Sequence, residues 1–520
     1  MDDIIAGALE KTAGLPNPDC DSWREGLEIL LRDHAHADRL TERGLVSVRN
    51  RYVDCLAARM AVDDYHRRHP ELAATAIKRP VFILGLPRTG TTMLSYLFES
   101  DPAVRSVLRW EAYNAAPPAA PGALRTDPRC LAEVAKDEMI LKVAAKVAAA
   151  HFEPGDSPTE CVHSLAQDFK SLMLAVITTT PTYHDWLMMT DMESAFTHRK
   201  RVLQILQSTN GGRWVLKMPS DSLFIRQLFK TFPDARVIWT HRDPYAASAS
   251  AIGMRGLSRP FSEVDASAEY MRQHFPLQFG FHVSRPLEVS QERPADFYHL
   301  YYDTMIADPV AEMRCVYGWL GDDWTPDAEA GMRQWLADNP QNKHGKHSYS
   351  FEEWGMTRDD VAPFFADYLR DQLGLLARHY DITLEVTRTG QQIPFPYVLD
   401  ASDGSDMGRV TPLELARHFP TTELADIGDE LADGLFGLDP TAAQPLALFD
   451  ALRTDFSLAR LRHYTGTAPE HFQRYILFTN YHRYVDEFVA WAGAQVGQGR
   501  YTALAGAAGL YVDQPGVNAS

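Results

Sequence analysis

The chain has 520 residues, a hydrophobic fraction of 45% and a charged fraction of 23%, which is ordinary for a globular protein. This length exceeds what one hydrophobic core usually serves, so we expect two domains. The net charge of −18 argues against nucleic acid or an anionic membrane surface as a general partner, because binding to such surfaces depends on clustered Lys and Arg. Any anion site must therefore be locally basic.

The amino terminus and the cysteines indicate the cellular compartment. The amino terminus is acidic and no apolar run approaches the roughly 18 residues of a membrane span, so neither a signal peptide nor a membrane span is predicted. No group of His, Cys and carboxylate residues has metal-ligand spacing, so no metal is expected. The cysteines are scattered without a CxxC pair, which favours a reducing cytoplasm: Cys20, Cys55, Cys130, Cys161 and Cys315.

Helical patterns come first along the chain. Apolar residues at three- and four-residue spacing predict helices within residues 1–78, including Trp23 to Arg32 and Leu45 to His69. Similar patterns predict helices over 133–151 and 164–177.

The stretch Val81–Glu99 predicts a buried strand, a glycine-bearing turn and a helix. Gly85 and Gly90 have the spacing of a phosphate-binding loop, in which backbone N–H groups and a helix N-terminus surround an anion. Thr91 stands where kinases carry the lysine that reaches the β- and γ-phosphates, so a triphosphate with magnesium is not expected. A turn that merely joins a strand to a helix would explain the glycines, but not their polar neighbours Arg88, Thr89, Thr91 and Thr92.

Two further strand-then-helix units follow. Trp214–Leu216 predicts a strand that ends at Lys217, after which Ser220 or Asp221 can cap a helix through Phe229. Residues 235–240 predict another strand, followed by Arg242 and by a helix that begins at Asp243-Pro244.

These units predict an α/β fold, a parallel sheet with helices on both faces, whose ligands bind beyond the carboxyl ends of the strands. Arg88, Lys217 and Arg242 all fall at such ends, which indicates an anion site. Ser250 follows Arg242 by two helical turns, or about 12 Å of rise, so the two residues could clamp one phosphate from both sides. The alternative for Arg242 is a simple pairing with Asp243 near the helix start.

The motifs resemble those of the PAPS-dependent sulfotransferases, particularly a large bacterial group, over about residues 20–375. The resemblance rests on PRTGTT at 87–92, WE at 110–111, LKMP at 216–219 and FPDAR with HRDP at 232–244. It implies a P-loop-type fold, 3′-phosphoadenylyl sulfate (PAPS) as the donor and adenosine 3′,5′-bisphosphate as the product. By the same resemblance the loop Arg88, Thr89, Gly90, Thr91 and Thr92 would bind the 5′-phosphosulfate, and Arg242 with Ser250 would bind the 3′-phosphate.

Two later segments extend the resemblance. Tyr302-Asp303 with Asp308-Pro309 resembles the family's YED…DP segment, which adds Tyr302 to the predicted cofactor site. The run from Lys343 through Lys346 to Tyr349 is similar to its closing basic loop near the 3′-phosphate, the alternative being a solvated basic patch. One departure concerns the family motif LKSPxH. This chain has Met218 in place of the serine and Asp221 in place of the histidine of that motif. A catalytic role of that histidine therefore cannot apply here.

Sulfuryl transfer needs a base for the acceptor hydroxyl, worth roughly 10²–10⁴-fold in rate, and charge neutralisation on the departing phosphate. Glu111 is the first choice for the base, the alternative being a salt-bridged residue beside a packed Trp110. Asp221 is the second choice, although a helix N-cap is the favoured interpretation. Arg88 and Lys217 would stabilise the bridging and peripheral oxygens, with hydrogen bonds from the loop threonines.

The predicted function is therefore transfer of a sulfuryl group to a hydroxyl of a small-molecule or lipid acceptor. The acceptor is expected to contact residues 111–190 and the Gly253–Val264 loop, which are apolar and aromatic with few charges. Two alternatives stay open: a non-catalytic nucleotide-binding or sensing protein, motivated by Asp221 and the appended domain, and a P-loop small-molecule kinase, against which Thr91 argues.

The pattern changes past Tyr380, which predicts a domain over 1–380 and a smaller α+β domain over 381–520. The second part resembles the N-terminal regulatory domain of bacterial AMP nucleosidases over about 365–512, through Ile393–Val398, Phe449–Arg453 and Phe478–Phe488. The glycosylase domain of that family is absent from the sequence, so AMP hydrolysis is not expected. We hypothesise that this domain forms a homo-oligomer or senses a purine nucleotide.

Overall fold

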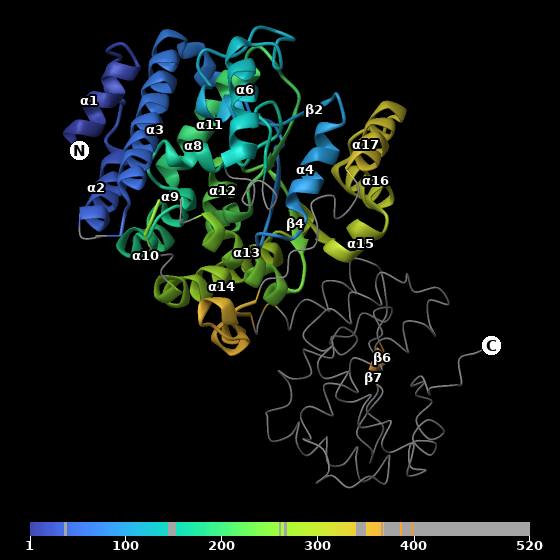
Figure 1. Cartoon of the computed structure of the whole chain (residues 1–520). Coiled ribbons are helices and arrows are strands. Elements are labelled where there is room, and N and C mark those ends of the chain that lie inside the picture. The colour runs from blue at the N-terminus through green and yellow to red at the C-terminus, as the bar shows by residue number, and fades with distance from the viewer. Residues whose placement is uncertain are drawn as a thin grey trace. The chain divides into compact units, whose positions relative to one another are not determined.

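The structure is a computed structural model, and it describes residues 1–35, 39–143, 152–258, 262–264, 268–339, 350–365, 368, 385–386 and 397–398. The chain divides into two compact units. The first comprises Met1–Leu300 and Val310–Phe364, and the second comprises Tyr301–Pro309 and Phe365–Ser520 (Figure 1). The predicted domain boundary near residue 380 stays a prediction.

A sheet of five strands forms the centre of the first unit, in the order β2-β3-β1-β4-β5. The strands are β1 (Val81–Gly85), β2 (Val104–Arg105), β3 (Arg213–Lys217), β4 (Arg236–His241) and β5 (Phe297–Tyr301). β1 pairs in parallel with both β3 and β4, and β2 pairs in parallel with β3. The carboxyl ends of these strands therefore meet at one edge, as the sequence predicted.

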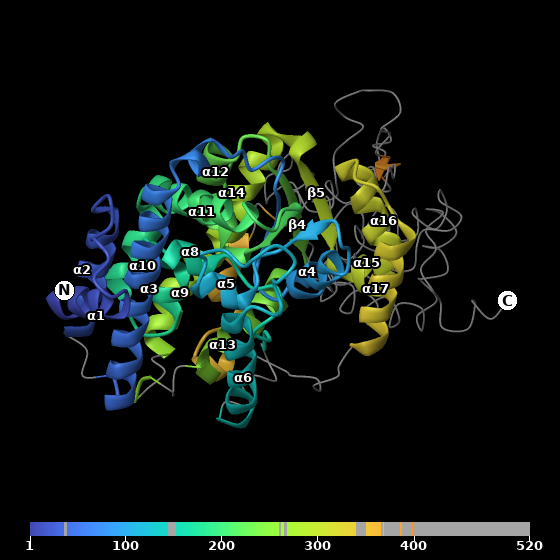
Figure 2. The same cartoon turned by 90° about the horizontal axis from the view of Figure 1, so that it is seen from above.

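Helices surround this sheet (Figures 1 and 2). In chain order they are α1 (Asp2–Lys11), α2 (Ser22–Ala35), α3 (Glu42–Arg68), α4 (Thr91–Glu99), α5 (Arg109–Tyr113), α6 (Pro128–Val143), α8 (Val162–Ala166), α9 (Leu172–Val176), α10 (Pro181–Met189), α11 (Glu193–Gln207), α12 (Ile225–Thr231), α13 (Pro244–Ser258), α14 (Ala268–Glu292), α16 (Pro309–Leu320) and α17 (Pro326–Asp338). Short 3₁₀ helices are η1 (Pro70–Ala74), η2 (Pro219–Phe224), η4 (Pro294–Asp296) and η5 (Glu352–Trp354). None of the helices that the structure describes is both long and apolar enough to cross a membrane. The predicted fold class, a parallel sheet covered by helices, is confirmed.

The core of the first unit lies on the sheet. Every residue of β1 is buried, which explains its unbroken apolar pattern. Trp214 on β3 and Trp239 on β4 are buried beside it. Full burial of a large apolar side chain stabilises a fold by about 1.5–3 kcal/mol, so the central strands are held firmly and give the loops at their ends a rigid base.

The second unit is described only in part. Its helix α15 (Tyr302–Ala307) follows β5, and two short strands, β6 (Glu385–Val386) and β7 (Tyr397–Val398), pair antiparallel. The AMP-nucleosidase-like motifs after residue 398 lie outside the described residues.

One predicted helix is wrong in its extent. The pattern over 164–177 forms two helices, α8 and α9, because Phe169 between them has a left-handed backbone with φ 52°. At this break the buried Asp168 accepts hydrogen bonds from Arg59, at 2.6 Å, and from Ser194, at 2.5 Å. The break thus places a carboxylate beside buried hydrogen-bond donors, which the apolar pattern of the sequence does not indicate. Of the helix predicted over 133–151, α6 covers the part to Val143, and 144–151 lies outside the described residues.

Candidate active site

The loop between β1 and α4 depends on the backbone of its glycines. Gly85 has φ +144°, and a Cβ atom there would lie 2.6 Å from Thr240 Oγ1, so no larger residue fits without displacement. Gly90 precedes α4 in a left-handed conformation with φ 89°. Arg88 also has a positive φ, 69°, which costs energy for a residue with a side chain. The loop is thus held in a strained shape above the sheet edge.

The structure brings together Arg88, Arg242 and Ser250, which the sequence predicted to bind phosphate. Arg88 Nε donates to Ser250 Oγ of α13 at 3.2 Å. Arg242, directly after β4, donates from Nη1 to the backbone oxygen of Arg88 at 2.8 Å. Two guanidinium groups meet at one loop in this way, which favours an anion there. Their phosphate-binding role stays a prediction.

The threonines of the loop occupy different environments. Thr89 is buried, and its hydroxyl bonds to Leu86 O at 2.7 Å and to Thr240 Oγ1 at 2.6 Å, so it fastens the loop to β4. Thr91 is buried and Thr92 is half-buried on the first turn of α4. The backbone N–H groups of this first turn have no partner within the helix, which makes it suited to an anion.

Lys217, at the end of β3, lies between two carboxylates. Its Nζ atom is 2.8 Å from Glu153 Oε1 and 3.3 Å from Glu160 Oε1, and its side chain is only 2% exposed. Burial alone would lower the pKa of Lys217, but the two carboxylates outweigh burial and raise it above the usual value. The backbone of Glu160 forms a parallel bridge beside Lys217, which places its side chain at this edge. Lys217 is therefore a permanent cation with carboxylates beside it.

Glu111, the predicted base, is fully buried. One carboxylate oxygen pairs with Arg105 at the end of β2, and the other accepts the backbone N–H of Leu108 at 3.1 Å. This is the salt-bridged arrangement beside a packed Trp110 that stood as the alternative. The structure gives Glu111 no accessible oxygen, so its role as base stays a prediction without support from its surroundings.

Asp221 forms a buried ion pair with Arg199 of α11. Arg199 donates to its two carboxylate oxygens at 2.6 and 2.9 Å, and each side chain is 1% exposed. Burial raises the pKa of Asp221, and the Arg199 guanidinium opposes that rise. The predicted N-cap is wrong, because Asp221 lies inside η2 and α12 begins only at Ile225. An enclosed, bidentate carboxylate has no free oxygen with which to take a proton from a substrate.

Three further residues were predicted to bind the cofactor. Tyr302 begins α15 in the second unit and is half-buried. Lys343 and Lys346 lie outside the described residues. Their roles stay predictions.

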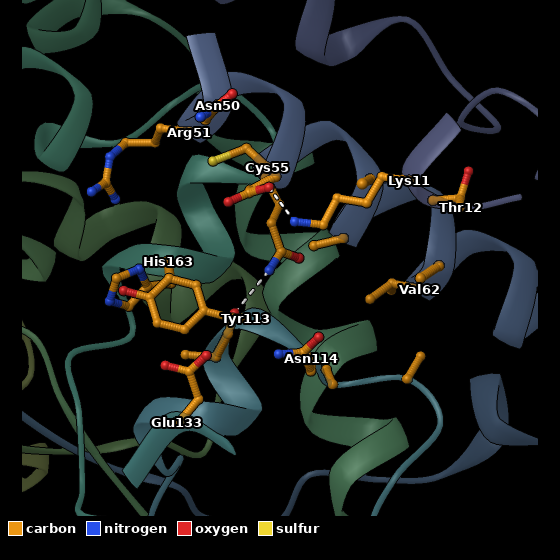
Figure 3. A pocket seen from close by; sticks show the side chains of 18 of the residues that line it. Lys11, Thr12, Asn50, Arg51, Cys55, Val62, Tyr113, Asn114, Glu133 and His163 are labelled. Atoms are coloured by element: carbon orange, nitrogen blue, oxygen red, sulfur yellow. Dashed lines mark hydrogen bonds and ion pairs between the residues drawn. The ribbon is translucent and has the colours of Figure 1, made fainter. Parts of the chain in front are cut away.

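A cavity of about 710 Å³ lies among the N-terminal helices, α5 and α8 (Figure 3). Alanines of α3 and of the segment after α5 supply small apolar walls: Ala57, Ala58, Ala61, Ala115 and Ala116. At one end the rings of Tyr113 and His163 lie 4.7 Å apart, with Arg109 nearby in the lining. The ion pair between Lys11 and Asp54 spans α1 and α3 at another part of the wall.

Two residues of the cavity wall interact with the glutamates whose carboxylates lie beside Lys217. Arg109 lines the cavity and donates to the backbone oxygen of Glu153 at 2.7 Å. Burial, together with the Arg51 charge, lowers the pKa of His163 to about 4, against the opposing charges of Glu153 and Glu160. His163 is therefore neutral near pH 7, and the wall of the cavity adjoins the carboxyl edge of the sheet.

Residues 80–326 match the sulfotransferase family. The crystal structure of the sulfotransferase STF9 from Mycobacterium avium shares 40% sequence identity with this chain, covers 71% of this chain and 95% of its own, and superposes with a TM-score of 0.67. This part of the chain belongs to the sulfotransferase family. The sulfotransferase part is also 26% identical, over 298 residues, to the omega-hydroxy-beta-dihydromenaquinone-9 sulfotransferase Stf3 of Mycobacterium tuberculosis, covering 53% of this chain and 71% of that protein.

The carboxyl-terminal part matches a second family. Residues 354–443 match the N-terminus of bacterial AMP nucleoside phosphorylase. An AMP nucleosidase of Escherichia coli K12 is 51% identical over 150 residues, which are 28% of this chain and 30% of that protein. The chain thus spans less than a third of the length of this relative. Both predicted resemblances are confirmed, and the chain joins a sulfotransferase to a nucleosidase-like segment.

Sequence reasoning missed Glu153 and Glu160 of the sulfotransferase part. They lie 64 and 57 residues before Lys217, in a segment that no periodic pattern marks. The available signal was a polar loop with two prolines, Phe152 to Glu160, which carries both carboxylates close before an apolar helix. The bridge beside β3 and the contacts of both glutamates with Lys217 place this loop at the strand end.

Proposed function

We propose that the first unit transfers a sulfuryl group from PAPS to a hydroxyl of a small-molecule or lipid acceptor. The observation that carries the proposal is the meeting of Arg88, Arg242 and Ser250 around a strained loop at the N-terminus of α4. Membership of the sulfotransferase family supports the same chemistry. A donor with two separate phosphate groups suits a site with two arginines on different elements.

The residues of the loop hold the donor. Arg88 and the N–H groups at the start of α4 bind the phosphosulfate end, with hydrogen bonds from Thr91 and Thr92. Arg242 and Ser250 bind the 3′-phosphate. Lys217 keeps its proton because Glu153 and Glu160 raise its pKa, so it supplies positive charge where the departing phosphate oxygen gains negative charge.

The base that accepts the hydroxyl proton lies in the carboxylate pair beside Lys217. Glu160 is the better placed of the two, because its side chain is 25% exposed, against 11% for Glu153. Glu153 is held further by the hydroxyl of Thr159 at 2.6 Å. Glu111 is the alternative base, and the experiment below separates it from Glu160.

The acceptor occupies the cavity of Figure 3. Its alanine walls and the Tyr113 ring can contact an apolar or aromatic body, whereas charged side chains such as Arg51 and Asp54 line other parts of the wall and can contact polar groups of the acceptor. Arg109 lines this space and donates to the backbone oxygen of Glu153, so the acceptor would lie beside the segment that carries the carboxylates. A lipid-like acceptor is consistent with the acceptor named for the mycobacterial Stf3 protein.

Two measurements test this function. Calorimetric titration of adenosine 3′,5′-bisphosphate should show binding by the wild type and a loss of about 10–100-fold in Arg242→Ala, since a charged hydrogen bond contributes about 1.5–3 kcal/mol. AMP and ATP serve as comparison ligands. Absence of binding by the wild type would refute the donor site.

Transfer of labelled sulfate from PAPS to a panel of hydroxylated acceptors then locates the base. Glu160→Gln should lower kcat about 10²–10⁴-fold while binding of the bisphosphate product stays unchanged. Glu292→Gln, on the exposed end of α14, is the matched control and should retain full activity. If Glu111→Gln instead loses kcat with unchanged thermal stability, Glu111 is the base.

One observation favours a second function, binding of the nucleotide without transfer. Both carboxylates predicted as bases, Glu111 and Asp221, are buried and paired. This alternative predicts tight binding of adenosine 3′,5′-bisphosphate with no labelled product from any acceptor.

For the nucleosidase-like segment we propose oligomerisation or sensing of a purine nucleotide. The identity of 51% to a known AMP nucleosidase supports a nucleotide-related role. Light scattering reports the oligomeric state, and melting temperature with sulfate transfer is measured with and without AMP, ATP and adenosine 3′,5′-bisphosphate. A monomer whose melting and activity ignore all three ligands would overturn the proposal.

A further inference from the structure

A group of possible metal ligands lies between α10 and α14, away from the residues assigned to transfer. It consists of His184 and Asp185 on α10 and His274 on α14, whose ligand atoms all lie within 4.8 Å of one another. The two helices are in contact in the fold. The sequence predicted no metal because His274 is 89 residues from Asp185, far outside any local ligand spacing.

The hydrogen bonds of His184 leave one ring nitrogen available. Its Nε2 atom is 2.9 Å from Gln278 Oε1, and an amide oxygen only accepts hydrogen bonds, so Nε2 carries a proton. The amide nitrogen of Gln278 lies 3.5 Å from His282 Nε2, and this contact fixes the orientation of the amide. In the neutral ring the lone pair is therefore on Nδ1, the nitrogen that faces Asp185. A partner that fixes the tautomer in this way is the usual second layer of a metal-binding histidine.

That Nδ1 atom is buried and has no hydrogen-bond partner among the described residues. The side chain of His184 is 2% exposed, and Asp185 Oδ1 lies 3.7 Å away, beyond hydrogen-bond distance. Two lone-pair donors that face each other at this separation repel unless a proton or a metal ion lies between them. Zinc-ligand bonds of about 2.0–2.2 Å in a tetrahedral arrangement place neighbouring ligand atoms about 3.3–3.6 Å apart, close to the distance found.

The third residue and the access route are supplied by His274 and Asp185. His274 Nδ1 lies 2.7 Å from the same Asp185 oxygen, within hydrogen-bond distance and closer than two ligand atoms of one zinc ion. Binding of an ion would therefore replace this hydrogen bond and separate the two atoms to about 3.3–3.6 Å. Asp185 is 68% exposed, which leaves a path from solvent to the buried nitrogen. Two imidazoles and one carboxylate form a set that suits Zn²⁺ and related divalent transition ions, with one position left for water.

We propose that His184, Asp185 and His274 form a binding site for a divalent transition-metal ion of the zinc type. The bound ion fastens α10 to α14. Because His282 of α14 meets Ser222 of η2 at 2.7 Å, α14 also supports the segment that follows Lys217. The site is structural in this assignment and does not depend on the proposed transfer reaction.

The experiment uses the full chain without an affinity tag, freed of metal with a chelator and titrated with Zn²⁺ and with Co²⁺. The wild type should bind one tight equivalent, melt at a higher temperature with Zn²⁺, and give the strong visible absorption of four-coordinate Co²⁺. Mg²⁺ and Ca²⁺ should produce no shift, because they prefer oxygen-only sites. Asp185→Asn and His274→Gln should each weaken Zn²⁺ binding by at least tenfold and abolish the Co²⁺ absorption.

His69→Gln is the matched control. His69 is an exposed histidine whose Nδ1 lies 3.3 Å from Glu71, and the described residues supply no third ligand there, so its loss should leave the tight site intact. Asp185 is mostly exposed, so Asp185→Asn keeps the fold even if His274→Gln does not, and equal melting temperatures of metal-free proteins verify this. Absence of a tight equivalent in the wild type, or tight binding retained by Asp185→Asn, would overturn the site.

Discussion

The ion pair between Asp221 and Arg199 provides the sharpest test of how the sulfotransferase site is built. Asp221 stands where the sequence resemblance implies a histidine, and it was the second candidate for the base. In the structure both of its oxygens bond to Arg199, at 2.6 and 2.9 Å, in a fully enclosed setting. The perturbation is Asp221→Ala, compared with a double variant that removes both charges, Arg199→Met with Asp221→Leu.

The burial of the pair sets the expected magnitude. Without Asp221 the enclosed guanidinium retains only weak bonds, to Ser164 Oγ at 3.3 Å and to Cys161 O at 3.4 Å. Breaking a buried pair by removing one partner costs about 3–5 kcal/mol, whereas replacing both charges with apolar residues is often neutral. We expect Asp221→Ala to lower the melting temperature of the sulfotransferase part by about 5–10 °C. The double variant should recover most of that loss.

Differential scanning calorimetry measures the melting temperature, and transfer of sulfate from PAPS measures the kcat of the folded protein. If Asp221 is structural, the double variant regains transfer together with stability. A double variant that melts like the wild type but has lost more than 100-fold in kcat would refute this reasoning and make Asp221 a catalytic residue. An unchanged melting temperature for Asp221→Ala would equally contradict the assigned energy of the pair.

Two further predictions concern the loop and the helix behind it. Gly85→Ala should abolish binding of adenosine 3′,5′-bisphosphate in calorimetry, because its Cβ would lie 2.6 Å from Thr240 Oγ1, whereas Gly318→Ala meets nothing within 4 Å and should leave binding intact. Burial lowers the pKa of His282 to about 3. The pKa of a histidine in the unfolded chain is about 6.5, so between pH 6.5 and 3 the unfolded state binds a proton that the folded state does not. The free energy of unfolding therefore falls as the pH drops through this range, by about 2 kcal/mol at pH 5. Urea midpoints at pH 7 and 5 should show this loss in the wild type and a smaller one in His282→Gln; equal losses would contradict it.

Local patterns predicted the framework of this site but not its carboxylates. Lys217 and Arg242 could be placed because Lys217 ends one strand, Arg242 directly follows another, and parallel strands end at one edge. The burial of Asp221 could not be predicted, because its partner Arg199 lies on a helix 22 residues away and no pattern in η2 indicates the pair. Glu160 approaches Lys217 through a bridge between segments 57 residues apart. Positions set by a strand end are local properties, whereas ion pairs in a core depend on how distant segments pack.

Glu111 has two possible roles, as the base or as a residue that positions the cavity wall. Its carboxylate joins Arg105, the last residue of β2, to the start of α5, and α5 ends at Tyr113 in the wall of the cavity. Loss of activity in a Glu111 variant would therefore follow either from a missing base or from a displaced cavity wall, and activity alone cannot distinguish them.

The kinetic constants can separate the two roles of Glu111. A base acts only in the transition state, so its removal lowers kcat and leaves the acceptor KM in place. A positioning residue holds the wall against which the acceptor binds, so Glu111→Gln should raise the acceptor KM and lower the melting temperature, with a smaller change in kcat. Arg105→Met should reproduce that pattern, because it removes the other half of the same pair. If the Arg105 variant keeps a normal KM while Glu111→Gln loses only kcat, Glu111 acts on the substrate directly.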